Sequence, residues 1–131
     1  MTYRWVDHTG ELELALEGKS EEEVFLAGLA ALQEVLVEDA NGPLERREIK
    51  LAARDRETLL ADWLSELVFL ADAEGFAPEH VAALALADER LRAIVEGRRG
   101  RTQNLVKAVT YHRLAFKDDD GAWQARVVLD V

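Results

Sequence analysis

Two capped, amphipathic segments carry the helix signature in this chain, and their small number limits the folds available to it. The first begins at the capping box Ser20-Glu21-Glu22-Glu23 and continues as an apolar stripe. The second begins after Asp55, a favoured N-cap residue, and is expected to end at Gly75. Alternating βαβ crossovers need more helices than this. The sequence therefore predicts the α+β class.

Segments that alternate with a period of two, or that are rich in β-branched and aromatic residues, predict the strands. They are residues 3–6, 11–17, 45–53, 78–88, 89–97, 105–112 and 122–131. Alanine dominates residues 81–87 and would also suit a helix, but the strand interpretation is preferred. We expect a central strand at 105–112, a basic loop at 98–101 and a hairpin turn at 118–121. The prediction is a single domain over residues 1–131, with a largely antiparallel sheet packed against two main helices.

The composition indicates a folded protein without membrane spans. Hydrophobic residues make up 49% and charged residues 32% of the 131 positions, which suits a globular chain. The longest wholly apolar run, residues 81–87, is far shorter than the roughly 20 residues that a bilayer requires. Arg4 and Asp7 interrupt any signal-peptide core near the N-terminus. We therefore expect a cytoplasmic protein.

The charge balance argues against strong, direct binding of nucleic acid. Sixteen lysines and arginines oppose 26 acidic residues, so the net charge of −10 repels a polyanion unless basic residues gather on one face. The plausible anion-contact patch consists of Arg98, Arg99 and Arg101, with Lys107 and Arg113. The alternative is a solvated loop that offsets the acidic excess.

Several classes of reactive site lack their residues. The chain has no cysteine, which excludes disulfides, thiolate zinc sites and thiol nucleophiles and leaves oxygen or imidazole as metal ligands. His8, His80 and His112 lack the spacing of a zinc site. Ser20 and Ser65 lack a nucleophile-elbow context. A hard cation is therefore the favoured metal.

Three acidic groups are candidate cation ligands. They are Asp7 with Glu11, the aspartate run 118–120, and Asp130 beside the carboxylate of Val131. Calcium takes six or more oxygen ligands, so donors must converge from separate segments. Each group also has an ordinary interpretation: Asp7 and the run 118–120 suit turns, and Glu11 suits the outward side of an amphipathic strand. Spacing alone does not show which of these segments meet.

Over nearly its whole length the chain resembles the archease family. The resemblance is carried by Asp7-His8-Thr9-Gly10-Glu11, by Leu59-Leu60 with Trp63-Leu64-Ser65-Glu66-Leu67, by Lys107-Ala108-Val109-Thr110-Tyr111-His112, and by Val128-Leu129-Asp130-Val131. Archeases are small α+β proteins that assist the tRNA-splicing RNA ligase, an enzyme with GTP- and manganese-dependent chemistry. The resemblance implies that the chain promotes guanylylation and turnover of that ligase and is not itself an enzyme.

The resemblance also implies a cation site. The family's calcium ligands correspond to Glu11, Asp130 and Val131, and manganese or magnesium are alternatives. The family has aspartate where this chain has Glu11, so the carboxylate moves outward by one methylene, and Gly10 supplies backbone freedom that can compensate.

Two other functions stay open. One is a chaperone-like modulator of a tRNA cytosine-5 methyltransferase, to which an archease has also been linked. The other is a small metal-dependent hydrolase that uses Asp7, His8 and Glu11 around a two-metal centre, although no second convergent ligand set is visible in the sequence.

Overall fold

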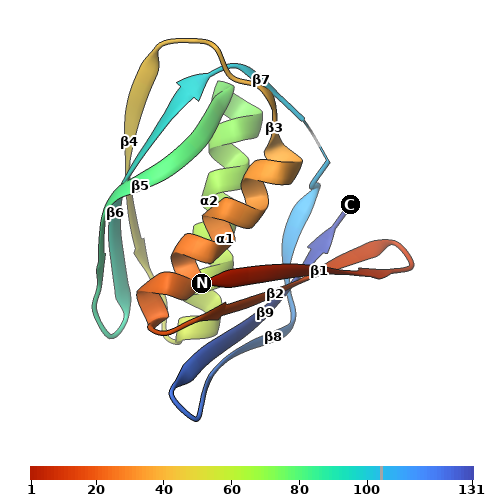
Figure 1. The fold of residues 1–131 in the computed structure, drawn as a ribbon, viewed down its shortest axis with the longest axis vertical. Coiled ribbons are helices and arrows are strands. Elements are labelled where there is room, and N and C mark those ends of the chain that lie inside the picture. Colours follow the sequence, from red (N-terminus) through yellow and green to blue (C-terminus); the bar gives the residue numbers. More distant parts are fainter. Residues whose placement is uncertain (104) are drawn as a thin grey trace.

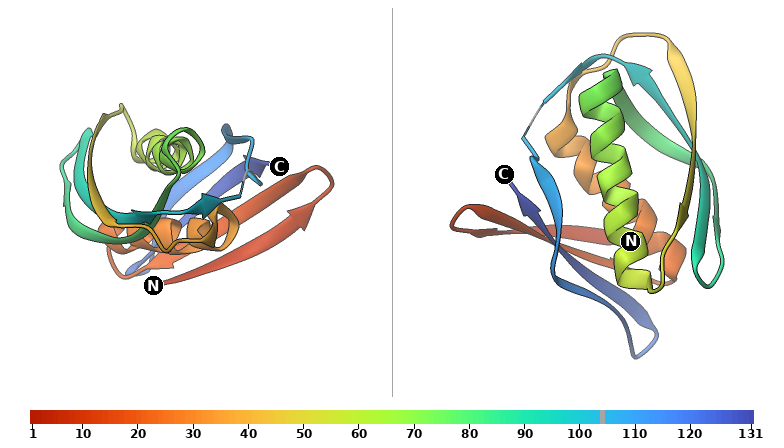
Figure 2. Two further views of the ribbon diagram at one scale, coloured as in Figure 1. Left: turned by 90° about the horizontal axis from the view of Figure 1, so that it is seen from above. Right: turned by 180° about the vertical axis from the view of Figure 1, so that it is seen from behind.

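The computed structural model describes residues 1–103 and 105–131, and in this part of the chain two helices lie between two antiparallel sheets (Figures 1 and 2). The helices are α1 (Glu21–Leu36) and α2 (Arg56–Glu74). Each helix contacts both sheets and the other helix. The buried side chains of all these layers form one apolar core, so the α+β prediction is confirmed.

The chemistry of the predicted caps is present at both helices. Ser20 Oγ accepts a hydrogen bond from the Glu23 amide at 3.2 Å, and Glu23 Oε1 accepts one from the Lys19 amide at 2.9 Å. Asp55 caps α2 through the Thr58 amide at 2.7 Å. Helix α2 ends at Gly75, whose φ of 64° is the left-handed conformation that glycine adopts without strain.

Helix α2 is the centre of the core. Its Trp63 side chain is fully buried, and the indole N–H donates to the Phe25 carbonyl of α1 at 3.0 Å. The hydrogen bond satisfies the one polar atom of a large buried ring. Helix α2 packs against α1 and against strands of both sheets. None of the described helices is long and apolar enough to cross a membrane.

The larger sheet has the strand order β1-β2-β9-β8. Its strands are β1 (Thr2–His8), β2 (Glu11–Gly18), β9 (Ala122–Asp130) and β8 (Ala108–Asp119). Leu14 and Leu16 of β2 and Val127 and Leu129 of β9 are buried on the helix side. The alternate residues of these strands therefore occupy the opposite face, which is turned away from the helices.

The smaller sheet has the order β4-β6-β5, from β4 (Leu44–Ala52), β6 (Arg90–Arg99) and β5 (Phe76–Leu86). A short ribbon pairs β3 (Val37–Asp39) with β7 (Arg101–Thr102). The alanine-rich stretch 81–87 lies in β5 through Leu86, so the strand interpretation is correct there.

Two local predictions were wrong. Residues 105–112 do not form a central strand: β8 begins at Ala108 and pairs with β9 alone, at the sheet edge. β-Branched and aromatic residues indicate a half-buried pleated surface and carry no information about strand order. Residues 98–101 are not a loop, because only Gly100 separates β6 from β7. A Cβ at Gly100 would lie 2.2 Å from the Asp39 carbonyl oxygen, so glycine permits this close strand switch.

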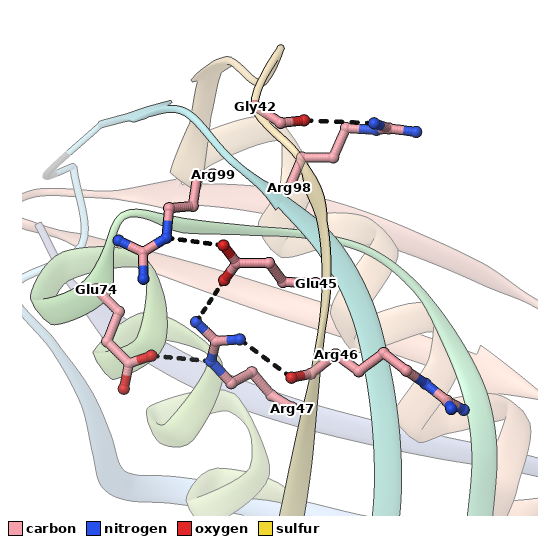
Figure 3. Close-up of polar contacts among 7 residues, drawn as sticks. All are labelled: Gly42, Glu45, Arg46, Arg47, Glu74, Arg98 and Arg99. Atoms are coloured by element: carbon pink, nitrogen blue, oxygen red, sulfur yellow. Dashed lines mark hydrogen bonds and ion pairs between the residues drawn. The ribbon is translucent and has the colours of Figure 1, made fainter.

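Arginine and glutamate side chains join the smaller sheet to the end of α2 (Figure 3). Arg47 binds Glu45 at 2.8 Å and Glu74 at 2.9 Å, and Arg99 also binds Glu45 at 2.8 Å. The guanidinium of Arg47 lies 4.8 Å from the centre of the Phe76 ring. The hydrogen bonds from Arg47 and Arg99 lower the pKa of Glu45.

We expect the protein to lose stability in acid. The pKa values of Glu45 and Glu48 are lowered by hydrogen bonds from Arg47 and Arg92 respectively, and that of Asp55 by its cap bonds to Thr58. A carboxylate with a lowered pKa in the fold stabilises it above the unfolded pKa, and this contribution disappears as the pH falls through the folded value. The free energy of unfolding should therefore decline below about pH 4.5, the ordinary pKa of glutamate. Urea titrations across this pH range measure it, and Glu45→Gln should flatten the decline.

Candidate metal centre

The strand register brings together two of the predicted ligands from opposite ends of the sequence. Glu11 is the first residue of β2 and lies directly opposite Asp130, the last residue of β9. Directly opposite residues of an antiparallel pair share a face, with Cβ atoms about 4.5–5.5 Å apart. Leu12 and Leu129 form the adjacent pair on the helix side, so Glu11 and Asp130 are on the face turned away from the helices. Val131 follows immediately and is 38% exposed.

The carboxyl end of β9 is fixed on both sides. Asp130 pairs with Glu11 of β2 and with Ala108 of β8, and its carbonyl accepts a hydrogen bond from the Lys107 amide at 2.8 Å. Backbone pairing therefore continues to the penultimate residue of the chain. Figure 1 shows this end of β9 and the tip of the β1–β2 hairpin on the side of the molecule away from the smaller sheet. Asp130 is exposed and Glu11 is half-buried, both at an ordered strand end.

The other residues of the opening motif are divided between the two faces. His8 lies opposite Glu11, whereas Asp7 lies opposite Leu12 and therefore belongs to the other face of β1. His8 is 3.8 Å from Glu13. The Asp7, His8 and Glu11 side chains therefore do not converge, which removes the geometric basis of the two-metal hydrolase alternative. Among residues 1–103 and 105–131, no three His, Asp or Glu side chains form a metal-binding group.

The remaining candidates have structural partners. Asp118 accepts a hydrogen bond from the Gly121 amide at 3.2 Å, which is the predicted hairpin-turn chemistry. In the expected anion-contact patch, Arg98 binds Glu79 at 3.3 Å and the Gly42 carbonyl at 3.3 Å, and Arg99 binds Glu45 (Figure 3). Arg101 lies 3.7 Å from Glu38. These arginines belong to the β6–β7 region. Lys107 instead precedes β8 directly and Arg113 lies within β8 of the larger sheet, so the patch is not a single cluster.

Sequence reasoning missed the immediate partner of Glu11. The Arg113 guanidinium of β8 donates a hydrogen bond to Glu11 Oε2, and the two side chains are 45% and 35% exposed. Close by in the same strand, Tyr111 donates to Asp62 of α2 at 2.5 Å, and this hydrogen bond raises the pKa of the tyrosine. Nothing in the sequence pattern signals the pairing of Arg113 with Glu11.

Comparisons with known proteins agree with the fold and with the ordered motifs. The Archease protein family (MTH1598/TM1083) matches residues 3–131. The chain belongs to the archease family. Protein archease from Methanothermobacter thermautotrophicus is 32% identical over 143 residues, which cover 98% of each chain. Protein archease from Methanosarcina mazei is 30% identical over 140 residues, which cover 98% of this chain and 95% of the relative.

Two solved structures share the archease fold of this chain. The solution structure of Methanobacterium thermoautotrophicum protein 1598 superimposes with a TM-score of 0.70 at 30% identity and covers 98% of each chain. The crystal structure of an archease, "possible chaperone", from Thermotoga maritima has a TM-score of 0.68 at 24% identity and covers 96% of this chain and 94% of that one. The second likeness supports the fold alone.

Proposed function

We propose that this archease is a metal-binding accessory protein that activates the tRNA-splicing RNA ligase by promoting its guanylylation and multiple turnover. The supporting observation is the cross-strand pairing of Glu11 with Asp130, which brings a half-buried and an exposed carboxylate together at the end of an ordered strand. The family resemblance supplies the ligase as partner, and the cytoplasm as location is the expectation from the composition. In this proposal the chain acts through its partner and performs no catalysis of its own.

The proposed ligands are Glu11, Asp130 and the α-carboxylate of Val131. These donors fit a hard cation, because carboxylate oxygens are the ligands that calcium prefers, and manganese or magnesium accept them too. Calcium takes six to eight oxygens, so three protein carboxylates leave coordination positions for water or a partner. When bound there, a divalent cation supplies positive charge that can neutralise phosphate oxygens.

The surface charge supports an enzyme partner rather than direct binding to RNA. A net charge of −10 opposes approach to a polyanion and favours approach to a basic surface. An enzyme that binds RNA has such a surface, and complementary charge raises the rate of association. The charge of the archease would therefore help it reach the ligase.

The deciding experiment measures formation of the covalent guanylyl-ligase from GTP and manganese, with and without this archease in substoichiometric amounts. Faster adduct formation and repeated RNA joining support the proposal. An unaffected ligase, together with altered specificity of a tRNA cytosine-5 methyltransferase, would favour the chaperone-like alternative; the Thermotoga relative is described as a possible chaperone. Hydrolysis of a phosphoester by the archease alone would contradict both accessory functions.

Replacing Glu11 by glutamine should weaken cation binding by about tenfold or more. Mutating residues that only hydrogen-bond to a metal ligand typically lowers metal affinity by about 10–100-fold, and Glu11 is itself a proposed ligand. The neutral amide keeps one oxygen donor but loses the negative charge that a hard cation requires. Calorimetric titration with calcium and with manganese measures the change. Unchanged affinity for both ions would return Glu11 to its ordinary interpretation as an exposed strand residue.

A further inference from the structure

β8 departs from regular pairing next to the candidate metal centre. Thr110 lies opposite Val128 and Ala115 lies opposite Arg126, so residues 111–114 of β8 face a single residue of β9. This is a large bulge, a feature that redirects side chains and is common beside functional sites. The bulge lies at the sheet edge, where it interrupts pairing with one neighbour only.

Arg113 has a strained backbone within this bulge. Its φ of 57° is in the left-handed region, and within residues 1–103 and 105–131 the other non-glycine residue with positive φ is Asp120. Aspartate is tolerated in this region, whereas a long side chain such as arginine is uncommon there. Such strain persists where the surroundings enforce it and is concentrated at binding and switching sites.

The contacts of the bulge explain where the strained residue is directed. Tyr111 anchors one end through its 2.5 Å hydrogen bond to Asp62 of α2. Arg113 then extends to the Glu11 carboxylate, 102 positions away in the sequence. The guanidinium thus meets one of the two carboxylates that the register brings together.

We propose that Arg113 is a built-in competitor for the cation site, whose guanidinium and a divalent cation exclude each other at the Glu11 carboxylate. The inference rests on the proposed cation site. Glu11 Oε2 accepts a hydrogen bond from the Arg113 guanidinium, so this oxygen is already engaged. The permanent positive charge of arginine also repels a cation that approaches the same carboxylate. Cation binding is then coupled to release of Arg113 and so to the conformation of residues 111–114.

An alternative role for Arg113 predicts the opposite change in cation affinity when the arginine is removed. Residues that hydrogen-bond to a metal ligand often orient it for the metal. If Arg113 positioned Glu11 in this way, its removal would weaken cation binding. If it competes, its removal strengthens binding. The direction of one affinity change therefore separates the two roles.

The test compares calcium and manganese affinity of the wild type and Arg113→Asn by calorimetry at low ionic strength. Asparagine removes the charge and tolerates positive φ, so the bulge keeps an acceptable backbone. We expect affinity to rise about three- to tenfold, the effect of losing an exposed ion pair and one repelling charge. Arg126→Gln is the matched control, because it removes the same charge from the same sheet face, where Arg126 lies 4.0 Å from Glu13.

The competition is contradicted if Arg113→Asn binds the cation no more tightly than the wild type, or if Arg126→Gln gives the same gain. The gain should also vanish when Arg113→Asn is combined with Glu11→Gln, and its persistence would contradict the proposal. If neither the wild type nor Arg113→Asn binds either ion, the proposed cation site itself is wrong. Hydrogen exchange gives a second readout: calcium should accelerate amide exchange at residues 111–114 in the wild type, and no change would overturn the coupling.

Discussion

We expect Asp130→Ala to abolish stimulation of the ligase while the protein remains folded. The substitution removes one of two carboxylates that the strand register places opposite each other. Cation affinity should fall by more than about 100-fold, because losing a ligand should cost more than the 10–100-fold typical of mutating a residue that hydrogen-bonds to a ligand. The Asp130 side chain is exposed, whereas its neighbours Val128 and Leu129 are 1% and 0% exposed, so the packing of β9 does not depend on it.

Asp119→Ala is the matched control for this variant. Asp119 is an exposed aspartate at the end of β8, where it pairs with Ala122 beside the hairpin turn, and it is absent from the proposed site. It should leave both the guanylylation rate and the cation affinity at the wild-type level. Urea unfolding of the two variants separates function from folding. If Asp130→Ala unfolds the protein outright, or stimulates the ligase fully, the residue is not the ligand that we propose.

The helices were predictable because their boundaries depend on neighbouring residues. Ser20 and Glu23 lie within one helical turn, and Asp55 caps an amide three residues away. These contacts require no knowledge of the rest of the fold. The left-handed end at Gly75 is equally local. The small number of helices then determined the α+β class, which the observed sheets confirm.

Strand order was not predictable in the same way, because it depends on distant partners. The apolar and aromatic residues of 105–112 indicated a strand but misplaced it at the centre of a sheet. The bulge at residues 111–114 has no turn signature, and the positive φ of Arg113 occurs without glycine or asparagine. Strain of this kind depends on tertiary contacts, here those of Tyr111 with Asp62 and of Arg113 with Glu11.

The candidate site was predictable only in its chemistry. The lack of cysteine and the poor spacing of the histidines left oxygen ligands, but composition and spacing did not show which of the three acidic groups would meet. Family resemblance selected Glu11 and Asp130. The register supplies a physical reason for that choice, since it pairs these two residues and places Asp7 on the other face.

Extending the chain beyond Val131 should impair cation binding and ligase stimulation, whereas an extension before Met1 should not. In the proposed site the α-carboxylate of Val131 is a charged ligand, and a peptide bond would replace it with a neutral carbonyl. The added residues would also occupy the coordination positions meant for water or a partner. We expect a loss of affinity of about 100-fold or more, comparable to the loss of a side-chain ligand.

The N-terminal extension is a fair control because the N-terminus and the proposed site lie at opposite ends of the β1–β2 hairpin. Thr2 pairs with Glu17 at one end of the β1–β2 hairpin, while His8 pairs with Glu11 at the other. The Met1 amine lies 3.6 Å from Glu23 at the start of α1, remote from Asp130. Equal cation affinity and equal ligase stimulation for the two extended proteins would mean that the end of β9 is merely a strand end exposed to solvent. The proposed ligand set would then be wrong, although membership of the archease family would stand on the sequence and the fold.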